Sequence, residues 1–252
     1  MRIIIANWKM YHDTRTALTL ARELLDLYGT TPLTHSKLIV CPPATTLVLL
    51  REYALKKKVT SIAWGAQYCS PYSEGAHTGE ISARMLSQAG AQYCLIGHQE
   101  RITEHHETVS SMRSMLTCCI ESGMTPILCV GESRENMSRL DAEREIKLIL
   151  DPLITHENLS KLSTILIAYE PRWAIGREQP APIMHINDSC QFILHTYPQA
   201  PITLLYGGSI QPHTVTALLT NSPVQGFLLG RAGADRQNLS KIVSLCDNFT
   251  LK

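Results

Sequence analysis

Short apolar runs recur along the chain, and each is followed by a stretch with a different spacing of apolar positions. The eight runs are Ile3–Ile5, Leu38–Val40, Ser61–Trp64, Tyr93–Ile96, Ile127–Val130, Ile165–Ala168, Ile202–Leu205 and Phe227–Leu229. Their apolarity is nearly continuous rather than alternating, which is typical of strands covered on both faces. They therefore predict the buried strands of a parallel sheet.

The stretches between the runs carry the spacing of amphipathic helices. In the first of them the apolar residues fall three and four positions apart: Ala17, Leu18, Ala21, Leu24, Leu25 and Tyr28. A helix with this spacing turns one apolar face toward the core. Asp13 is its expected N-cap and Gly29 its expected C-terminal stop. Comparable stretches follow later runs at Val109–Ile120, Ser138–Leu150 and Val215–Leu219.

A strand followed by a helix, eight times over, predicts a (β/α)8 barrel, the TIM barrel, as one domain over residues 1–252. An open, doubly wound sheet is the alternative. The G-x-G-x-x-G expected after the first strand of such a sheet is missing. No linker rich in Pro or Ser and no low-complexity tract divides the chain, which favours the single barrel.

The composition narrows the classes of function. A formal net charge of +1 argues against a nucleic-acid or membrane-surface partner. No apolar run reaches the roughly 18 residues of a membrane span. The N-terminal MRIIIANWKM is too weakly apolar for a signal peptide, so we expect a cytoplasmic protein. The eight cysteines are scattered without a C-x-x-C, which predicts buried apolar thiols rather than disulfides or a metal site.

Polar residues gather just beyond the predicted strands, where a barrel places its active site. They are Asn7, Lys9, His98 to Arg101, Glu170, Gly207-Gly208-Ser209 and Gly230-Arg231. Taken one at a time, a surface lysine is the favoured interpretation of Lys9 and a structural histidine that of His98, and Glu170 could start a turn. Their joint position at strand ends favours one shared pocket.

Glycine-rich turns after the seventh and eighth strands suit a phosphate group. The segments are YGGSI (Tyr206–Ile210) and LLGRAGAD (Leu228–Asp235). Backbone N–H groups at such turns bind phosphate, and barrels often place a phosphate site there. A carboxylate beside a cation and a hydrogen-bond donor is suited to moving a proton next to a carbonyl. The expected ligand is a small phosphorylated molecule.

Six segments, in order along the chain, resemble those of the triosephosphate isomerase family. They are ANWKM (Ala6–Met10), GAHTGEIS (Gly75–Ser82), IGH-x-ER (Ile96–Arg101), LCVGE (Leu128–Glu132), AYEPRWAIG (Ala168–Gly176) and YGGSI (Tyr206–Ile210). The resemblance runs from the first strand to the last. It implies a cofactor-free isomerase that interconverts D-glyceraldehyde 3-phosphate and dihydroxyacetone phosphate through an enediolate, in glycolysis and gluconeogenesis.

The resemblance also implies the family's known role for each matching residue. Glu170 would be the base that moves the proton between C1 and C2. His98 would be the neutral electrophile at the substrate oxygens. Lys9 would supply positive charge, and Asn7 would hold and orient it. Glu100 would lie behind these residues, paired with a cation.

The remaining matches concern the phosphate and the lid. Gly176, Ser209, Gly230 and Arg231 would present backbone N–H groups to the phosphate. The segment Pro171–Ala181 would be a lid whose closure excludes water and prevents loss of phosphate from the intermediate.

The GAHTGE segment implies a partner subunit. By the resemblance it is a protruding loop that docks beside Lys9 and His98 of a second copy, with Thr78 at its tip. A homodimer is therefore expected. No metal, cofactor, nucleic acid or membrane partner is expected.

Three features depart from the family's pattern. Gln99 stands where serine is usual, and we expect it to hydrogen-bond Glu170 while the lid is open and to swing aside on closure. The second half of the lid reads Arg177-Glu178-Gln179-Pro180-Ala181, where a glycine of the family's pattern is lost and a proline is gained. The range of φ and ψ angles open to the hinge should therefore be narrower. Arg231 replaces a glycine, and its N–H stays available only if its φ is negative or strain is tolerated.

Two alternatives to the main interpretation remain at this level. One is the same chemistry on a related phosphosugar such as an erythrulose phosphate, with Gln99 and the lid adjusting the pocket. The other is a barrel that has lost activity and serves as a scaffold. The joint presence of Asn7, Lys9, His98 and Glu170 argues against a scaffold, which has no use for that set.

Overall fold

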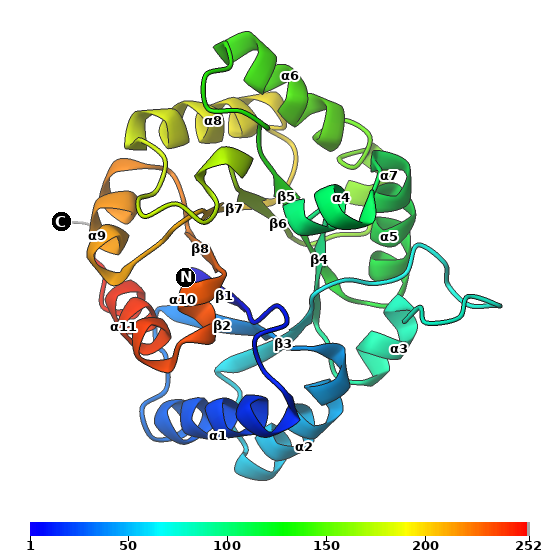
Figure 1. Ribbon diagram of the computed structural model, residues 1–252, viewed down its shortest axis with the longest axis vertical. Coiled ribbons are helices and arrows are strands. Elements are labelled where there is room, and N and C mark those ends of the chain that lie inside the picture. Colours follow the sequence, from blue (N-terminus) through cyan, green and yellow to red (C-terminus); the bar gives the residue numbers. More distant parts are fainter. Residues whose placement is uncertain (251–252) are drawn as a thin grey trace.

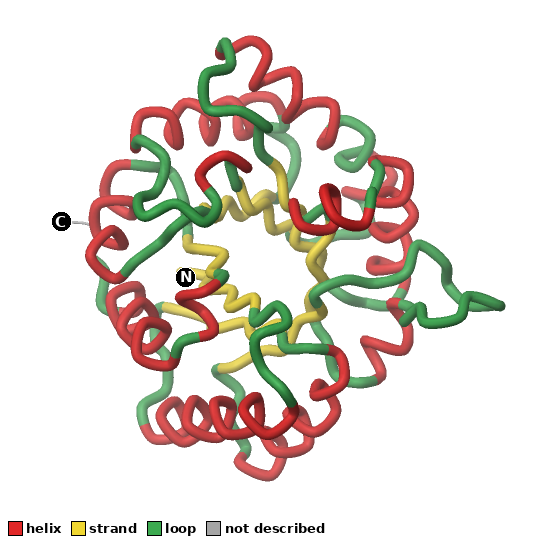
Figure 2. Tube along the Cα trace, viewed as in Figure 1, coloured by secondary structure: helices red, strands yellow, loops and turns green. Residues whose placement is uncertain are grey.

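A computed structural model describes residues 1–250, which form a closed barrel of parallel strands with helices around it (Figures 1 and 2). The strands pair in chain order, and the last returns to the first. Their bounds are β1 (Arg2–Asn7), β2 (Ser36–Cys41), β3 (Ile62–Ala66), β4 (Tyr93–Ile96), β5 (Thr125–Val130), β6 (Ile165–Tyr169), β7 (Ile202–Gly207) and β8 (Gly226–Leu229). The predicted barrel is confirmed, and each apolar run contributes one strand.

Helices occupy the connections between the strands and form the outer ring (Figure 2). The α-helices are α1 (Thr14–Thr30), α2 (Leu47–Lys57), α3 (Ala83–Gln88), α4 (Gln99–His105), α5 (Val109–Glu121), α6 (Arg139–Leu150), α7 (His156–Leu159), α8 (Ile183–Thr196), α9 (Pro212–Asn221), α10 (Arg231–Ala234) and α11 (Arg236–Asp247). Two 3-10 helices are η1 (Ala44–Thr46) and η2 (Arg172–Ala174). Within residues 1–250, none of the helices has the length and apolarity needed to cross a membrane.

The strands are buried on both faces because successive side chains point to opposite sides of a sheet. Ile3, Ile5 and Ile39 belong to the cluster that fills the barrel. Ile4 and Leu38 belong to the cluster between the barrel and the helices. Both clusters exclude water, which explains why the runs are continuous in apolarity.

Helix α1 begins as predicted but ends later. Asp13 accepts a hydrogen bond from the backbone N–H of Thr16 at 2.8 Å, which confirms it as the N-cap. The expected stop at Gly29 is wrong, because α1 continues to Thr30. Gly29 does not adopt a left-handed φ. A Cβ there would lie 3.0 Å from Val59 Cγ2, so this glycine permits close packing rather than ending the helix.

The cysteines behave as the composition predicts. All eight are free thiols and all are buried, so they pack as small apolar residues.

One long connection leaves the body of the barrel. The segment 67–82, between β3 and α3, extends outward as a narrow loop (Figure 1). Its residues 72–81 are exposed, Thr78 among them. The rings of Tyr72 and His77 stack with their centroids 3.7 Å apart, which gives the loop internal order. The protrusion predicted for GAHTGE is therefore present.

Candidate active site

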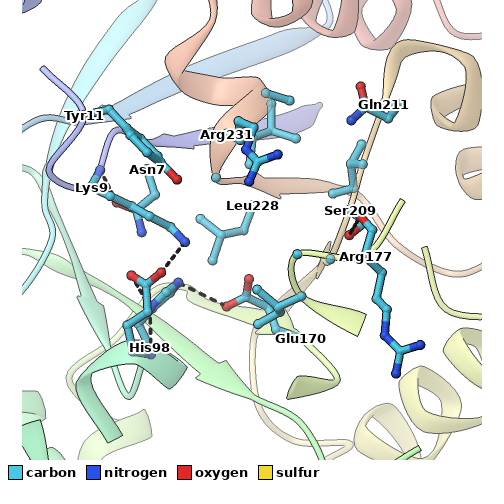
Figure 3. A pocket seen from close by; sticks show the side chains of 18 residues that line it. Asn7, Lys9, Tyr11, His98, Glu170, Arg177, Ser209, Gln211, Leu228 and Arg231 are labelled. Carbon is cyan, nitrogen blue, oxygen red and sulfur yellow. Dashed lines mark hydrogen bonds and ion pairs between the residues drawn. The ribbon is translucent and has the colours of Figure 1, made fainter. Parts of the chain in front are cut away.

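A cavity of about 260 Å³ opens at the carboxyl ends of the strands (Figure 3). Most of the polar residues expected at the strand ends line it: Asn7, Lys9, His98, Glu100, Glu170, Gly176, Ser209, Gly230 and Arg231. They come from the turns after β1, β4, β6, β7 and β8 and from residues 171–181, the segment predicted to be a lid and called the lid below. The barrel therefore brings together segments that are up to 224 positions apart in the sequence (Arg231 against Asn7).

Glu170 follows β6 directly, and its backbone N–H donates to Val130 O at 2.8 Å. The side chain is buried, with 7% of the residue exposed. Its Oε2 atom has no hydrogen-bond partner among residues 1–250 and lies 3.9 Å from His98 Nε2. Burial raises the pKa of Glu170 above 4.5, against the smaller opposing effects of His98 and Lys9. A buried carboxylate with a free oxygen and a raised pKa is suited to accept a proton from a ligand.

Two glycines make room for Glu170. A Cβ on Gly131 would lie 2.0 Å from Glu170 O, so the backbones of the β5 and β6 turns approach too closely for any side chain. A Cβ on Gly207 would lie 2.4 Å from Glu170 Oε1 and 2.4 Å from its Cγ. The side chain of Glu170 therefore rests directly on the backbone at the end of β7.

His98 is oriented by the start of helix α4. Its Nδ1 accepts a hydrogen bond from the backbone N–H of Glu100 at 3.3 Å. In a neutral imidazole the other nitrogen then carries the hydrogen. Nε2 faces Glu170 across the pocket (Figure 3), so the ring presents a donor beside the carboxylate.

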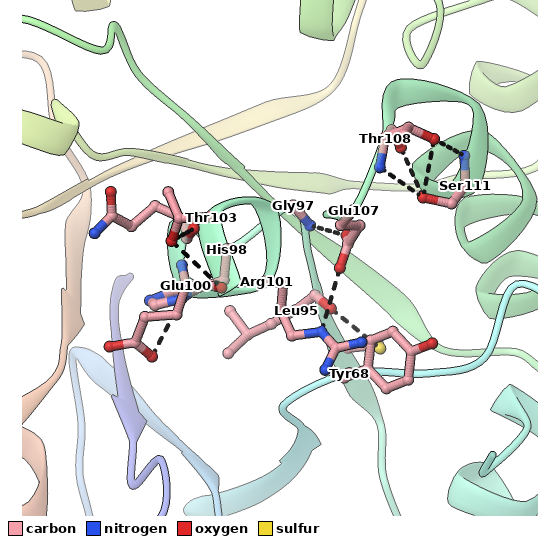
Figure 4. A network of polar contacts seen from close by, with 12 residues as sticks. Tyr68, Leu95, Gly97, His98, Glu100, Arg101, Thr103, Glu107, Thr108 and Ser111 are labelled. Carbon is pink, nitrogen blue, oxygen red and sulfur yellow. Dashed lines mark hydrogen bonds and ion pairs between the residues drawn. The ribbon is translucent and has the colours of Figure 1, made fainter. Parts of the chain in front are cut away.

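A second polar network fixes the turn that carries His98 (Figure 4). Glu107 accepts hydrogen bonds from the backbone N–H of Gly97 at 3.0 Å and from Arg101 Nε at 3.4 Å. Burial raises the pKa of Glu107, while those two donors act in the opposite direction. The guanidinium of Arg101 lies over the Tyr68 ring, 3.7 Å from its centroid. Because Tyr68 begins the protruding loop, the loop and the turn of His98 are joined.

Lys9 has an unusual backbone conformation, and three neighbours hold the residue in place. Its φ is 48°, a left-handed value that is uncommon for lysine. Its backbone N–H donates to Asn7 Oδ1 at 3.1 Å, and its carbonyl accepts from Gln67 Nε2 at 2.9 Å. Its ammonium pairs with Glu100 Oε1 at 2.5 Å. Asn7 and Gln67 thus set the backbone, and Glu100 sets the direction of the charge.

The lid is bonded down onto the β7 turn. The backbone N–H of Ala181 donates to Tyr206 OH at 2.9 Å. Ser209 Oγ lies 2.9 Å from Ala174 O and 2.6 Å from Arg177 O, and its hydroxyl donates to these carbonyls. The guanidinium of Arg177 turns outward to Glu135 at 3.1 Å. Gly176 lines the pocket with a φ of 77°.

In the turn after β8, Arg231 has the negative φ that was required for its backbone N–H to be available. This residue begins α10 and is not among the residues with a positive φ. The first N–H groups of a helix have no acceptor within it, so they are free to bind a ligand. A Cβ on Gly230 would lie 3.3 Å from Lys9 Cε, so the glycine leaves room for the lysine. The side chain of Arg231 points toward the pocket (Figure 3).

Four of the residues named from the sequence do not line this pocket: Thr78, Gln99, Arg101 and Gly207. Thr78 is on the protruding loop. Gln99 is the first residue of α4 and borders a small recess of about 10 Å³ that Glu170 also borders. Among the described residues no hydrogen bond joins Gln99 to Glu170. The bond was predicted for an open lid, and here the lid is bonded onto β7 and the turn after it, so the prediction is not tested.

Sequence reasoning missed several contributors. Tyr11 and Gln211 line the pocket, and Gln67 supports Lys9. Gln67 comes directly after β3, so the rule of polar residues at strand ends applies to it. The third apolar run is the weakest of the eight, and its true end at Ala66 was not evident.

Comparisons with known proteins agree on one family. A model of the family described as triosephosphate isomerase matches residues 2–246. The triosephosphate isomerase of Synechococcus sp. (strain JA-2-3B'a(2-13)) is 34% identical over 245 residues, 96% of this chain and 96% of that protein. The one from Protochlamydia amoebophila (strain UWE25) is 31% identical over 251 residues, 96% of this chain and 92% of that protein. The crystal structure of triosephosphate isomerase from Bartonella henselae has a TM-score of 0.81 and 28% identity, covering 97% of this chain and 98% of that one.

Proposed function

This chain belongs to the triosephosphate isomerase family, and we propose that the pocket of Glu170, His98 and Lys9 carries out the family's reaction. The enzyme is an aldose–ketose isomerase acting on triose phosphates. The observation that carries the proposal is the buried carboxylate of Glu170, with a free oxygen 3.9 Å from His98 Nε2.

Glu170 removes the proton from C2 of glyceraldehyde 3-phosphate. The electrons of that C–H bond form the C1–C2 double bond, and the carbonyl oxygen on C1 becomes negative. Glu170 then returns a proton to C1 while the hydroxyl on C2 becomes the ketone, which gives dihydroxyacetone phosphate. A single carboxylate serves both carbons because it changes from base to acid between the two transfers.

His98 and Lys9 stabilise the negative oxygen of the enediolate. The Nε2–H of His98 donates to the substrate oxygens and relays a proton between them. The ammonium of Lys9 supplies positive charge, and Glu100 holds it in place at 2.5 Å. Donors fixed before the reaction act strongly in a pocket from which water is excluded.

The phosphate is held by the turns after β7 and β8 and by the lid. Gly176, Ser209, Gly230 and Arg231 present backbone N–H groups there, as their positions around the cavity support. The hydroxyl of Ser209 bonds the lid and so leaves the phosphate to the backbone. The relatives favour neither a longer phosphosugar nor an inactive scaffold as the function.

A homodimer completes the proposal, and a cytoplasmic location is proposed with it. The protruding loop is exposed over residues 72–81. Large apolar side chains are exposed on the loop, just beyond it and in the turn after β1: Met10 (96%), Tyr11 (55%), Tyr72 (51%), Ile81 (39%) and Met85 (55%). Such a group of exposed apolar side chains is typical of a subunit interface.

The test is a coupled assay of glyceraldehyde 3-phosphate turnover. Glycerol-phosphate dehydrogenase and NADH report the dihydroxyacetone phosphate that forms. We expect rapid oxidation of NADH with wild type, a large loss with Glu170→Asp, and no loss with Glu157→Asp, a matched change on the surface helix α7. Folded wild type without activity would overturn the proposal, and a panel of four-carbon phosphates would then separate the other phosphosugar from the scaffold.

A further inference from the structure

A buried carboxylate beyond the pocket joins the two ends of the lid. Glu132 follows β5 and none of it is exposed. Its Oε1 accepts hydrogen bonds from Trp173 Nε1 at 2.7 Å and from His185 Nε2 at 2.8 Å. Its Oε2 accepts from Tyr169 OH at 3.0 Å, and its backbone carbonyl accepts from Arg172 N at 3.0 Å. Both oxygens of a fully buried carboxylate are thus satisfied by side chains.

Two of these donors lie on opposite sides of the lid along the chain. Trp173 lies in η2, at the start of the lid, and His185 lies in the first turn of α8, just after the lid ends. The two hinges of the lid therefore meet on one oxygen atom. We call Glu132, Trp173 and His185 the Glu132 clasp. The lid also bonds Tyr206 near the end of β7 and Ser209 in the turn after it.

His185 is the group in the clasp that changes charge near neutral pH. Its hydrogen bond to Glu132 raises the pKa of His185 above 6.5, although burial acts in the opposite direction. Burial alone would raise the pKa of Glu132, but hydrogen bonds, that from His185 foremost, bring it below 4.5. The carboxylate therefore stays ionised while His185 titrates.

Among the groups around His185, Glu132 has the largest effect on the pKa of His185. On its own helix, Asp188 adds a smaller attraction for the protonated ring. On α6, Arg139 interacts with Asp188 and bonds Glu143. On β6 and β7, the phenols of Tyr169 and Tyr206 are neutral, since burial raises the pKa of both. On α9, the titratable residue is His213, which is exposed and not among the groups that shift His185.

We propose that His185 is a positioning residue that binds both hinges of the lid to Glu132, and that its protonated form holds the lid shut more firmly than its neutral form. The inference rests on the proposed function, because it concerns how well the lid seals the enediolate. Protonation of His185 adds a charge–charge attraction to the hydrogen bond that the neutral ring already donates to the ionised Glu132. The closed lid therefore loses part of its support as pH rises through the titration of His185.

An incompletely sealed lid has a chemical signature. In the enediolate the C3–O bond breaks when the phosphate leaves with the bonding electrons. The remaining enol then tautomerises to methylglyoxal, so one orthophosphate and one methylglyoxal form for each intermediate lost. The ratio of methylglyoxal to isomerised product measures the seal for each active enzyme molecule. Partial unfolding lowers both products together and leaves this ratio unchanged.

The experiment measures that ratio from pH 6 to pH 9 for wild type and His185→Gln, with an enzyme-free blank subtracted. An amide at position 185 still donates to Glu132 but never carries charge. We expect the wild-type ratio to rise roughly fivefold with pH, because the charge–charge attraction between His185 and Glu132 is lost. The ratio of His185→Gln stays at the high value throughout. His195→Gln, an exposed change on the same helix, follows wild type. A His185→Gln profile that overlays wild type overturns the inference.

A second measurement needs neither the variant at position 185 nor activity. The chain has three tryptophans, and Trp173→Phe assigns the indole N–H signal of Trp173 in an NMR spectrum of the wild type. That signal shares its acceptor oxygen with His185, so we expect it to shift with pH, with a midpoint above 6.5. A signal that does not titrate refutes the inference even if the isomerase assay succeeds. Failure of that assay concerns the proposed function alone.

Discussion

Replacing Gly207 by alanine should displace the carboxylate of Glu170, which we propose as the base. Gly207 ends β7 and does not have a left-handed φ, so its backbone accepts an alanine. The atoms nearest to the added Cβ all belong to Glu170: Cγ and Oε1 at 2.4 Å and Cδ at 2.6 Å. The clash therefore falls on the side chain of the base.

The size of the effect follows from the distances. Ordinary van der Waals contact begins at 3.4 Å, and the new methyl would lie at 2.4 Å, so the carboxylate must move by 1.0 Å (3.4 minus 2.4). A misplacement of about 1 Å in a catalytic group costs on the order of 10²-fold in rate. Each tenfold loss is about 1.36 kcal/mol of transition-state stabilisation, so a hundredfold loss is about 2.7 kcal/mol.

The coupled assay should show kcat of Gly207→Ala reduced about 100-fold. The matched control is Gly29→Ala on α1, where the added Cβ meets only Val59 at 3.0 Å. That variant keeps wild-type kcat even if its melting temperature changes. A Gly207→Ala enzyme with kcat within about twofold of wild type would show that Glu170 is not the base, or that it acts from another position.

Three further outcomes are expected. Burial raises the pKa of Glu170, so the stability that its protonated form contributes is fully present below pH 4.5 and is lost as the pH rises through the raised pKa. Glu170→Gln should therefore raise Tm by about 2–4 °C at pH 8, and a calorimetric gain that persists below pH 4.5 would contradict this. Gln99→Ser should raise kcat severalfold if Gln99 holds Glu170 in the open state, and identical values would remove the idea. Wild type should sediment as a dimer at micromolar concentration and Thr78→Arg as a monomer, because a large charged side chain at the loop tip cannot be buried; a monomeric wild type would refute the docking of the loop.

The barrel could be predicted from the local pattern of apolar residues because both faces of each strand are buried. Runs such as Ile3–Ile5 and Ile165–Ala168 need no alternation in that setting, and their apolar continuity marks the strands. Helix boundaries were less certain. Gly29 looks like a stop in the sequence, yet its absence of a side chain serves the approach of Val59 instead. Contacts made by residues distant in the chain override a local signal.

The pocket was predictable where a single polar residue follows a strong strand, as with Glu170 and His98. Residues that act on the pocket only by holding another residue in place could not be predicted. Gln67 sets the backbone of Lys9 across 58 positions, and no local feature of the sequence indicates that contact. His185 reaches Glu132 across 53 positions, and its helical spacing suggests only an exposed surface. Pairings of this kind depend on the closure of the barrel and appear only in the structure.

The most direct test of the central claim measures where hydrogen from the solvent enters the product, rather than the rate of turnover. Glyceraldehyde 3-phosphate converted in D2O by wild type should give dihydroxyacetone phosphate with deuterium at C1 and nowhere else, because Glu170 exchanges its proton with solvent between the two transfers. Glu170→Gln should still bind phosphoglycolate and incorporate no deuterium. Incorporation at the wild-type rate by Glu170→Gln would mean that another group moves the proton, and the assignment of Glu170 as the base would be wrong.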